Sequence, residues 1–313
     1  MAIKSISLGG FRIALTANAS EAGLRFSVGG PLWRGFVRWI RRRRSSENSA
    51  QWDAAAGELA GSGAACVDRH APEAAALMGR VNAIRWYHTI DLGNGIKTPG
   101  RFDHTPDLAA YRLPENVTGL RVLDVATFDG FWAFQFEKRG AREVYALDLA
   151  APSDLDWPPK RLAQATPEEL AATFGGGFAL AKEQLGSNVR RVVCSVYDLR
   201  PESFGTFDIV HVGDLLAHLN SPIKALQNIA RVCSGYALIS DVYFRELDQL
   251  GMPKLVEYMN GADGPTWWRI SLSALREMIL DAGFARVELL NTFSHGYRVL
   301  PGRWRQAVFK ACK

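Results

Sequence analysis

Two aspartates follow short apolar runs in an order that suits nucleoside binding. Asp124 lies in the run 121–126, and Asp148 ends the run 144–148, 24 residues further along the chain. Between them the chain turns through residues 127–130 into a helical pattern, so backbone N–H groups and a helix N-terminus can approach a ligand closely. An acid at this distance after the turn can accept hydrogen bonds from both hydroxyls of a ribose.

The segments around these acids alternate between strand and helix patterns. Short apolar runs separated by runs of helical periodicity are typical of a parallel α/β sheet. The expected strands are residues 121–126, 143–148, 190–194, 207–212, 235–241, 285–292 and 305–311. The expected helices are residues 130–139, 177–186, 221–232 and 271–282. The last two strands follow the final helix and are expected to form a hairpin.

The same residues resemble a known family. The segment VLDVATFDG followed by YALD resembles the class I S-adenosylmethionine-dependent methyltransferases, whose first motif usually reads VLDxGxGxG. The resemblance implies that Asp124 orients the loop and holds the methionine amino group of the cofactor, and that Asp148 holds its ribose. Ala126 and Phe128 replace two glycines of the family pattern, and only Gly130 remains.

Two further segments resemble the same family. The segment CSVYD stands where the family contacts adenine, which implies cofactor contacts for Val196 and Tyr197. The segment FDIVHVG resembles the strand whose end lies beside the transferred methyl group, which implies contacts for Val212 and Gly213. The resemblance covers residues 86–313 and implies a Rossmann-like, seven-stranded methyltransferase sheet with a C-terminal hairpin.

A narrower resemblance points to one branch of that family. The segments WYHTIDLGNGIKTPG, VATFDGFWAF and GDLLAHLNSP resemble the tRNA wobble-uridine 5-oxyacetate synthases, which transfer a carboxymethyl group from carboxy-S-adenosylmethionine. That branch has a tyrosine directly before the histidine of its fourth-strand motif. Here Ala217 precedes His218, and the loop has an extra residue. The missing phenol favours plain methyl transfer, with tRNA modification as the alternative.

The candidate catalytic residues lie outside these motifs. His88 and Asp91 belong to a loop that could cover the cofactor as a lid, with His88 as a proton acceptor; the alternative is that they only fix the loop. His218 could contact the substrate, or cap a helix, or lie in the core, and His211 is expected to be structural. A base is needed only if the acceptor must lose a proton.

Aromatic residues are expected to line the acceptor site. An apolar pocket would suit a small molecule with an O, N or S acceptor atom, such as an amino acid or a natural product. The candidate lining residues are Trp132, Tyr243, Trp267 and Trp268. A non-catalytic Rossmann scaffold is disfavoured, because both acids and Gly130 are present.

Three regions of the chain differ in pattern. We expect a small β-meander followed by a basic helix in residues 1–45, a helical and lid region in residues 46–115, and the catalytic domain in residues 116–313. The arginines 41–44 could be a solvated helix end or could bind RNA phosphates. Because so small a sheet is not stable alone, we expect it to pack on the chain or on a partner subunit of a homo-oligomer.

Composition excludes several classes of protein. The chain has 313 residues, 48% of them hydrophobic, and a net charge of +5, which is ordinary for a soluble protein of about two domains. Its four cysteines, Cys66, Cys194, Cys233 and Cys312, are scattered and predict neither a disulfide framework nor a metal site. No apolar run is long enough to span a membrane or to form a signal peptide. We therefore expect a cytoplasmic enzyme without a metal.

Overall fold

The computed structural model describes most of the chain in two compact units. The described residues are 2–8, 11–17, 24–29, 72–249, 254–262, 264–296, 298 and 303–313. The units are residues 1–53 and 54–313. The expected basic helix, the arginines 41–44 and Cys66 lie outside the described residues, so the predicted boundary at residue 45 stays a prediction.

The first unit contains the expected small β-meander. Three strands pair antiparallel in the order β1-β2-β3. They are β1 (Ala2–Leu8), β2 (Phe11–Ala17) and β3 (Leu24–Gly29). The alternation of apolar and polar residues indicated β2 and β3, whereas β1 was not predicted.

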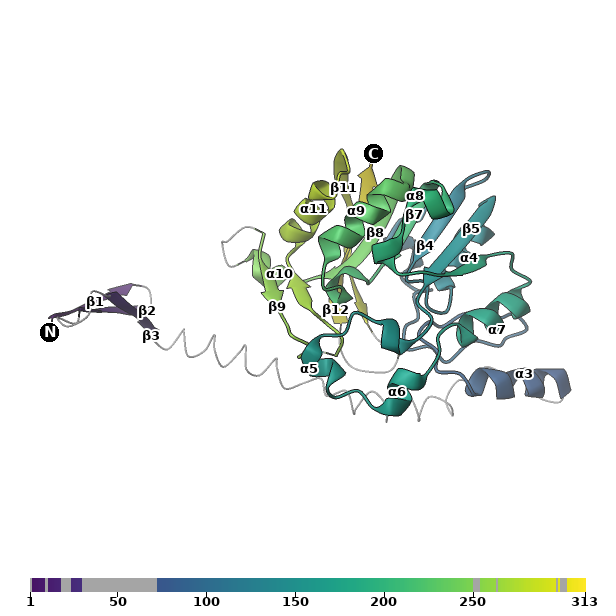
Figure 1. Cartoon of the computed structure of the whole chain (residues 1–313), viewed down its shortest axis with the longest axis horizontal. Helices are drawn as coiled ribbons and strands as arrows, with labels where there is room; N and C mark the ends of the chain where they lie inside the picture. The colour runs from purple at the N-terminus through teal and green to yellow at the C-terminus, as the bar shows by residue number, and fades with distance from the viewer. Residues whose placement is uncertain are drawn as a thin grey trace. The chain divides into compact units, whose positions relative to one another are not determined.

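The second unit is built on a seven-stranded sheet in the order β11-β12-β8-β7-β4-β5-β6 (Figure 1). The five strands from β8 to β6 in this order pair in parallel, and β12 lies antiparallel between β8 and β11. The strands are β4 (Arg121–Val125), β5 (Glu143–Asp148), β6 (Arg190–Val193), β7 (Phe207–Gly213), β8 (Cys233–Tyr243), β11 (Arg286–Gly296) and β12 (Arg303–Cys312). All seven predicted strands, the closing hairpin and the Rossmann-like fold class are confirmed.

The four predicted helices are also confirmed. They are α4 (Phe131–Lys138), α7 (Gly176–Leu185), α9 (Pro222–Val232) and α11 (Leu272–Asp281). α9 begins at a proline, which suits the first helical position, and the Ser271 hydroxyl caps α11 by accepting the N–H of Ala274. In the region expected to be helical, the described part has α3 (Pro72–Asn82), followed by largely irregular chain.

Several short elements were not predicted. They are the helices α5 (Pro159–Leu162), α6 (Pro167–Ala171), α8 (Pro201–Phe204) and α10 (Arg245–Asp248), and the strands β9 (Val256–Tyr258) and β10 (Trp268–Ile270), which form a separate antiparallel pair. Each has three to five residues. Elements so short do not complete enough periods for an apolar pattern to reveal them.

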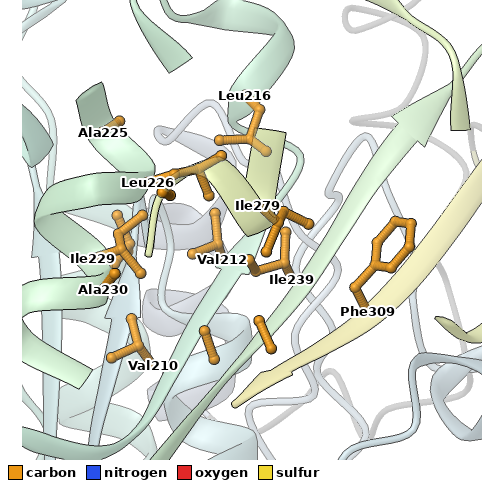
Figure 2. Packing of buried hydrophobic residues seen from close by; sticks show 14 of the residues in the cluster. Val210, Val212, Leu216, Ala225, Leu226, Ile229, Ala230, Ile239, Ile279 and Phe309 are labelled. Atoms are coloured by element: carbon orange, nitrogen blue, oxygen red, sulfur yellow. The ribbon is translucent and has the colours of Figure 1, made fainter. Parts of the chain in front are cut away.

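One face of the large sheet packs against α9 and α11. Figure 2 shows Val210 and Val212 of β7 and Ile239 of β8 beside Leu226 and Ile229 of α9. All five side chains are buried. This face is a continuous apolar core, and it gives the site its rigid support.

The opposite face packs against α4 and against the segment that precedes β4. Phe134 and Phe136 of α4 lie in one buried cluster with Ile209 of β7 and with Trp86 and Ile90. Because side chains alternate along a strand, residues 209 and 210 of β7 serve different cores. By the same alternation, Asp124 of β4 and Asp148 of β5 lie on this α4 face.

Candidate active site

The turn after β4 keeps a glycine-like backbone although two expected glycines are missing. Ala126 and Phe128 take positive φ angles of 59° and 49°, and Gly130 has φ of 89°. This left-handed conformation costs a residue with a side chain roughly 1–2 kcal/mol. A Cβ atom at Gly130 would lie 2.7 Å from ring atoms of Phe134 and Phe178, so this position requires glycine.

Asp148 lies at the end of β5 beside this turn and is 7% exposed. Its Oδ2 accepts the N–H of Phe128 at 2.7 Å, and its Oδ1 accepts the N–H of Leu149 at 2.7 Å. Burial raises the pKa of Asp148 to about 6, against the lowering effect of these hydrogen bonds. Each carboxylate oxygen retains a second acceptor position, so the ionised group fits the two hydroxyls of a ribose.

Both carboxylate oxygens of Asp124 accept hydrogen bonds from side chains of the protein. Its Oδ1 accepts the Nδ1–H of His211 at 2.7 Å, and its Oδ2 accepts the hydroxyl of Thr127 at 2.7 Å. The side chains of Asp124 and His211 are both 1% exposed. Asp124 therefore ties the turn after β4 to β7, and a contact of this acid with the methionine amino group stays a prediction.

Asp129, which was not predicted as a site residue, holds the segment before the catalytic domain against the turn. Its Oδ2 accepts the N–H groups of Tyr87 at 2.6 Å and of His88 at 2.9 Å. Burial raises the pKa of Asp129 to about 7, while these two hydrogen bonds act in the opposite direction. The predicted lid segment thus docks through its backbone.

The two lid residues predicted to be catalytic occupy different environments. His88 is buried, and burial lowers its pKa to about 3, so its ring is neutral at pH 7. Asp91 is exposed, and its Oδ1 accepts the N–H of Gly93. Asp91 therefore shapes a turn and does not join His88; the loop-fixing alternative describes it better.

The segment expected to contact adenine is held by internal contacts. The Tyr197 hydroxyl donates to Oδ2 of Asp156 at 2.6 Å and accepts the N–H of Ser221 at 3.0 Å. Burial and the Asp156 carboxylate raise the pKa of Tyr197. The Val196 side chain is buried in the α9 core, so only its backbone can contact a cofactor.

Gly213, at the end of β7, lies on the α4 face, four residues after Ile209. Val212 is buried in the α9 core, on the opposite face. A Cβ atom at Gly213 would lie 3.2 Å from Cε1 of His211 and 3.3 Å from Nε1 of Trp132. Gly213 therefore borders Trp132, and any larger residue would displace these rings.

The four aromatic residues expected to line one pocket are not brought together. Trp132 belongs to the α4 face, whereas Tyr243 and Trp268 belong to the α9 core. The indole of Trp267 donates to the carbonyl of Asp156 at 2.6 Å. The reason is strand alternation on β8, which places Tyr243 on the face opposite Ser240.

His218 is held by a backbone carbonyl. Its Nδ1–H donates to the carbonyl of Pro265 at 3.1 Å, and burial lowers its pKa. This contact fixes the loop before β10. Its predicted contact with a substrate remains untested.

A polar cluster on the α4 face was missed in the sequence. It combines residues from the lid segment, from the loop after β7 and from the hairpin strands, namely His104, Asp107, Asp214, His295 and Gln306. These residues are far apart in the chain and belong to no motif. The sequence carries no signal for them, because the burial of His295 and Gln306 appears only in the fold.

The described part of the chain gives no sign of a membrane span or of a metal site. None of its helices combines the length and the apolar character that crossing a bilayer requires. In the same residues, no three His, Cys, Asp or Glu side chains gather closely enough to hold a metal ion.

Comparison with known proteins agrees with this geometry. The family model described as "Methyltransferase domain" matches residues 101–289, which is more than half of the chain. The structure is similar to that of the N-terminal domain of EvdMO1 with SAH bound, at 18% identity and a TM-score of 0.54, over 79% of this chain and 99% of that one. It is also similar to magnesium protoporphyrin IX methyltransferase (ChlM) from Synechocystis PCC 6803 with bound SAH, at 16% identity and a TM-score of 0.41, over 63% of this chain and 75% of that one. Among curated proteins, no sequence matches.

The sheet order, the turn after β4 and the acid at the end of β5 agree with the family match. S-adenosylmethionine is the cofactor that this family uses, and the buried Asp148 beside the turn fits its ribose. The chain therefore belongs to the class I S-adenosylmethionine-dependent methyltransferases.

Proposed function

We propose that this enzyme methylates an O, N or S atom of a small molecule, such as an amino acid or a natural product. The observation that carries the proposal is the burial of the α4 face beside Gly213. Trp86 and Ile90 of the lid segment are buried in the same cluster as Trp132, and Asp129 holds the segment through two backbone N–H groups. An acceptor site enclosed in this way suits a small molecule.

The proposed roles follow from the positions of the side chains. Asp148 would accept the ribose hydroxyls, and the turn at residues 126–130 would follow the cofactor closely. The acceptor would lie at the end of β7, near Gly213 and Trp132. The cofactor supplies a methyl group activated by a cationic sulfur. The protein aligns the two reactants, and the lid segment excludes water.

The absence of a tyrosine before His218 supports the ordinary cofactor over its carboxylated relative. Ala217 stands at that position, and its carbonyl accepts the N–H of Trp267. The Ala217 side chain is buried and offers no donor to a carboxylate. A direct competition of the two cofactors for binding tests this point, and a clear preference for the carboxylated form would return tRNA modification to first place.

A transfer experiment separates the two acceptor classes. Cofactor with a labelled methyl group is incubated with the protein and either a metabolite extract or total tRNA. We expect label in small molecules, and its loss in Asp148→Ala. Label in tRNA that depends on the arginines 41–44 and falls steeply with salt would support the alternative.

We also propose that the N-terminal unit serves self-association or substrate placement and not cofactor binding. Its three strands offer no acid-and-turn arrangement of the kind found at Asp148. Deleting residues 1–45 should change the oligomeric state or the acceptor affinity and leave cofactor affinity within a few-fold. Loss of cofactor binding in a folded deletion variant would contradict this division.

A further inference from the structure

Two buried histidines each form a pair with a carboxylate. Nδ1–H of His211 donates to Asp124, and Nδ1–H of His295 donates to Oδ2 of Asp107 at 2.9 Å. In both rings the Nε2 atom is buried and has no hydrogen-bond partner among the described residues. A histidine held in this way presents a free lone pair on Nε2, which is the arrangement of a general base.

The His295 pair lies on the same face of the sheet as Gly213. Gly213 is in register with Ser240 of β8. Gln306 of β12 pairs with Val242 of β8, which is two residues after Ser240. His295 of β11 pairs with Trp304 of β12, which is two residues before Gln306. Because side chains alternate along each strand, the α4 face is shared by Gly213, Ser240, Gln306 and His295.

Three of these four residues carry a buried polar atom that has no hydrogen-bond partner among the described residues. These atoms are Oγ of Ser240, Oε1 of Gln306 and Nε2 of His295, each on a residue at most 1% exposed. The Gln306 amide donates to Oδ1 of Asp214, the residue after Gly213. Buried polar atoms nearly always have partners, so these three atoms point to a polar ligand.

Ring contacts connect His295 with the end of β7. His295 stacks on His104 with 4.6 Å between ring centroids, and His104 lies 4.9 Å from the Trp132 ring. Nε1 of Trp132 is 3.3 Å from the position of a Cβ atom at Gly213. His211 contacts Asp124 and the rings of Trp132 and Phe136, whereas His295 is one of the residues with unpartnered polar atoms that share the face with Ser240 and Gln306.

We propose that the acceptor is a hydroxyl compound and that His295 is its general base, with Asp107 as the positioning residue. The O–H bond of the acceptor breaks and its proton moves to Nε2 of His295. The electron pair left on oxygen forms the bond to the cofactor's methyl carbon, and the pair of the broken carbon–sulfur bond stays on sulfur. This inference rests on the proposed function, which puts the transferred carbon beside Gly213.

The surroundings of His295 suit this role. The titratable groups that face it are Asp107 and His104 from the lid segment, Tyr111 behind His104, and Asp214 after β7. Burial lowers the pKa of His104, which therefore stays neutral at pH 7. Of these groups Asp107 alone bonds Nδ1 of His295, so it sets the tautomer.

Two unreactive ligands test the position of Nε2 without a known acceptor. S-adenosylhomocysteine lacks the methyl group, and sinefungin carries an amine in its place. An ammonium group beside Nε2 of His295 and Asp214 should donate to both, so calorimetry should show at least about tenfold tighter binding of sinefungin. In Asp107→Asn the amide can donate to Nδ1 of His295, so the ring proton can move to Nε2. The preference for sinefungin over S-adenosylhomocysteine should then fall by about tenfold, while the affinity for S-adenosylhomocysteine is unchanged.

Controls keep the test decisive. Asp103→Asn changes a matched aspartate in the same loop, whose Oδ1 accepts the N–H of Thr105, and should leave the preference intact. His295→Phe should remove the preference, and if it does not fold, Asp107→Asn still decides, because that side chain is 33% exposed. Histidine nitrogen NMR of the full chain should show Nε2 of His295 unprotonated in the wild type and protonated in Asp107→Asn.

The outcomes distinguish this inference from the proposed function. If S-adenosylhomocysteine binds but sinefungin is not preferred, or if neither variant changes the preference, His295 does not face the acceptor and the inference is wrong. A protonated Nε2 in the wild type overturns it equally. If neither ligand binds, the proposed function itself is wrong.

Discussion

The backbone N–H of Phe128 donates to Oδ2 of Asp148 at 2.7 Å, so the turn after β4 and the acid at the end of β5 form one unit. Phe128 has a positive φ of 49°, in a place where the family usually has glycine. The bond shows how the chain keeps the shape of the turn without that glycine. It also means that changes in the turn and in Asp148 act on the same site.

Gly130→Ala should destabilise the protein. The new Cβ atom would lie 2.7 Å from ring atoms of Phe134 and Phe178, at a φ of 89°. Left-handed strain and overpacking together should lower the free energy of unfolding by about 2–4 kcal/mol. Gly119→Ala is the matched control, since it has φ of 81° and no atom within 4 Å of the new Cβ, and urea denaturation should show the smaller loss there.

Ala126→Gly should instead increase the free energy of unfolding. Ala126 has φ of 59°, and glycine relieves a strain of roughly 1–2 kcal/mol while adding an entropic cost of roughly 0.5–1 kcal/mol. A gain of about 0.5–1 kcal/mol in the free energy of unfolding is expected. Ala133→Gly, inside α4, should instead be destabilising; a loss at both positions would show that Ala126 is not strained.

Asp129→Asn should make stability less dependent on pH. The pKa of Asp129 is raised from 3.8 to about 7, so between about pH 4 and pH 7 the folded protein binds a proton that the unfolded chain has released. The free energy of unfolding therefore falls as pH rises through this window, by at most about 4 kcal/mol from this group. The amide keeps an acceptor for Tyr87 and His88 but cannot ionise.

The measurement is denaturant unfolding at several pH values. In Asp129→Asn the slope of the free energy of unfolding against pH should become shallower by about one proton. It should not vanish, because the pKa values of Asp148 and Asp241 are raised as well. The same slope in Asp129→Asn and in wild type would show that this carboxyl group does not titrate in the window. Asp103→Asn serves as the control and should keep the wild-type slope.

The strands and long helices of the second unit could be predicted because their apolar patterns repeat over several residues. The face of the sheet on which each strand residue lies could not be predicted, since the sequence does not say in which core a residue such as Tyr243 or Val212 is buried. The acids of the cofactor motif were visible from their spacing. The pair of Asp107 and His295 was not, because 188 residues separate them and only the sheet brings them together.

Cofactor affinity should depend on pH through Asp148. Burial raises the pKa of this group to about 6, and only the ionised carboxylate accepts both ribose hydroxyls. Affinity should be constant above pH 6 and fall about tenfold per unit below it, since binding must then release a proton. Asp148→Asn should bind weakly and without this dependence; an unchanged pH profile in that variant would assign the titration to another group.

The central claim is that Asp148 holds the ribose of S-adenosylmethionine, and calorimetry with S-adenosylhomocysteine tests it most directly. The wild type should bind, and Asp148→Ala should bind about a hundredfold more weakly, which corresponds to about 3 kcal/mol for two hydrogen bonds to a charged group. Asp154→Ala, six residues further on, changes an acid whose Oδ2 accepts the N–H of Ala151, and should keep the wild-type affinity. Equal affinity in a folded Asp148→Ala variant, or no binding by the wild type, would contradict the account.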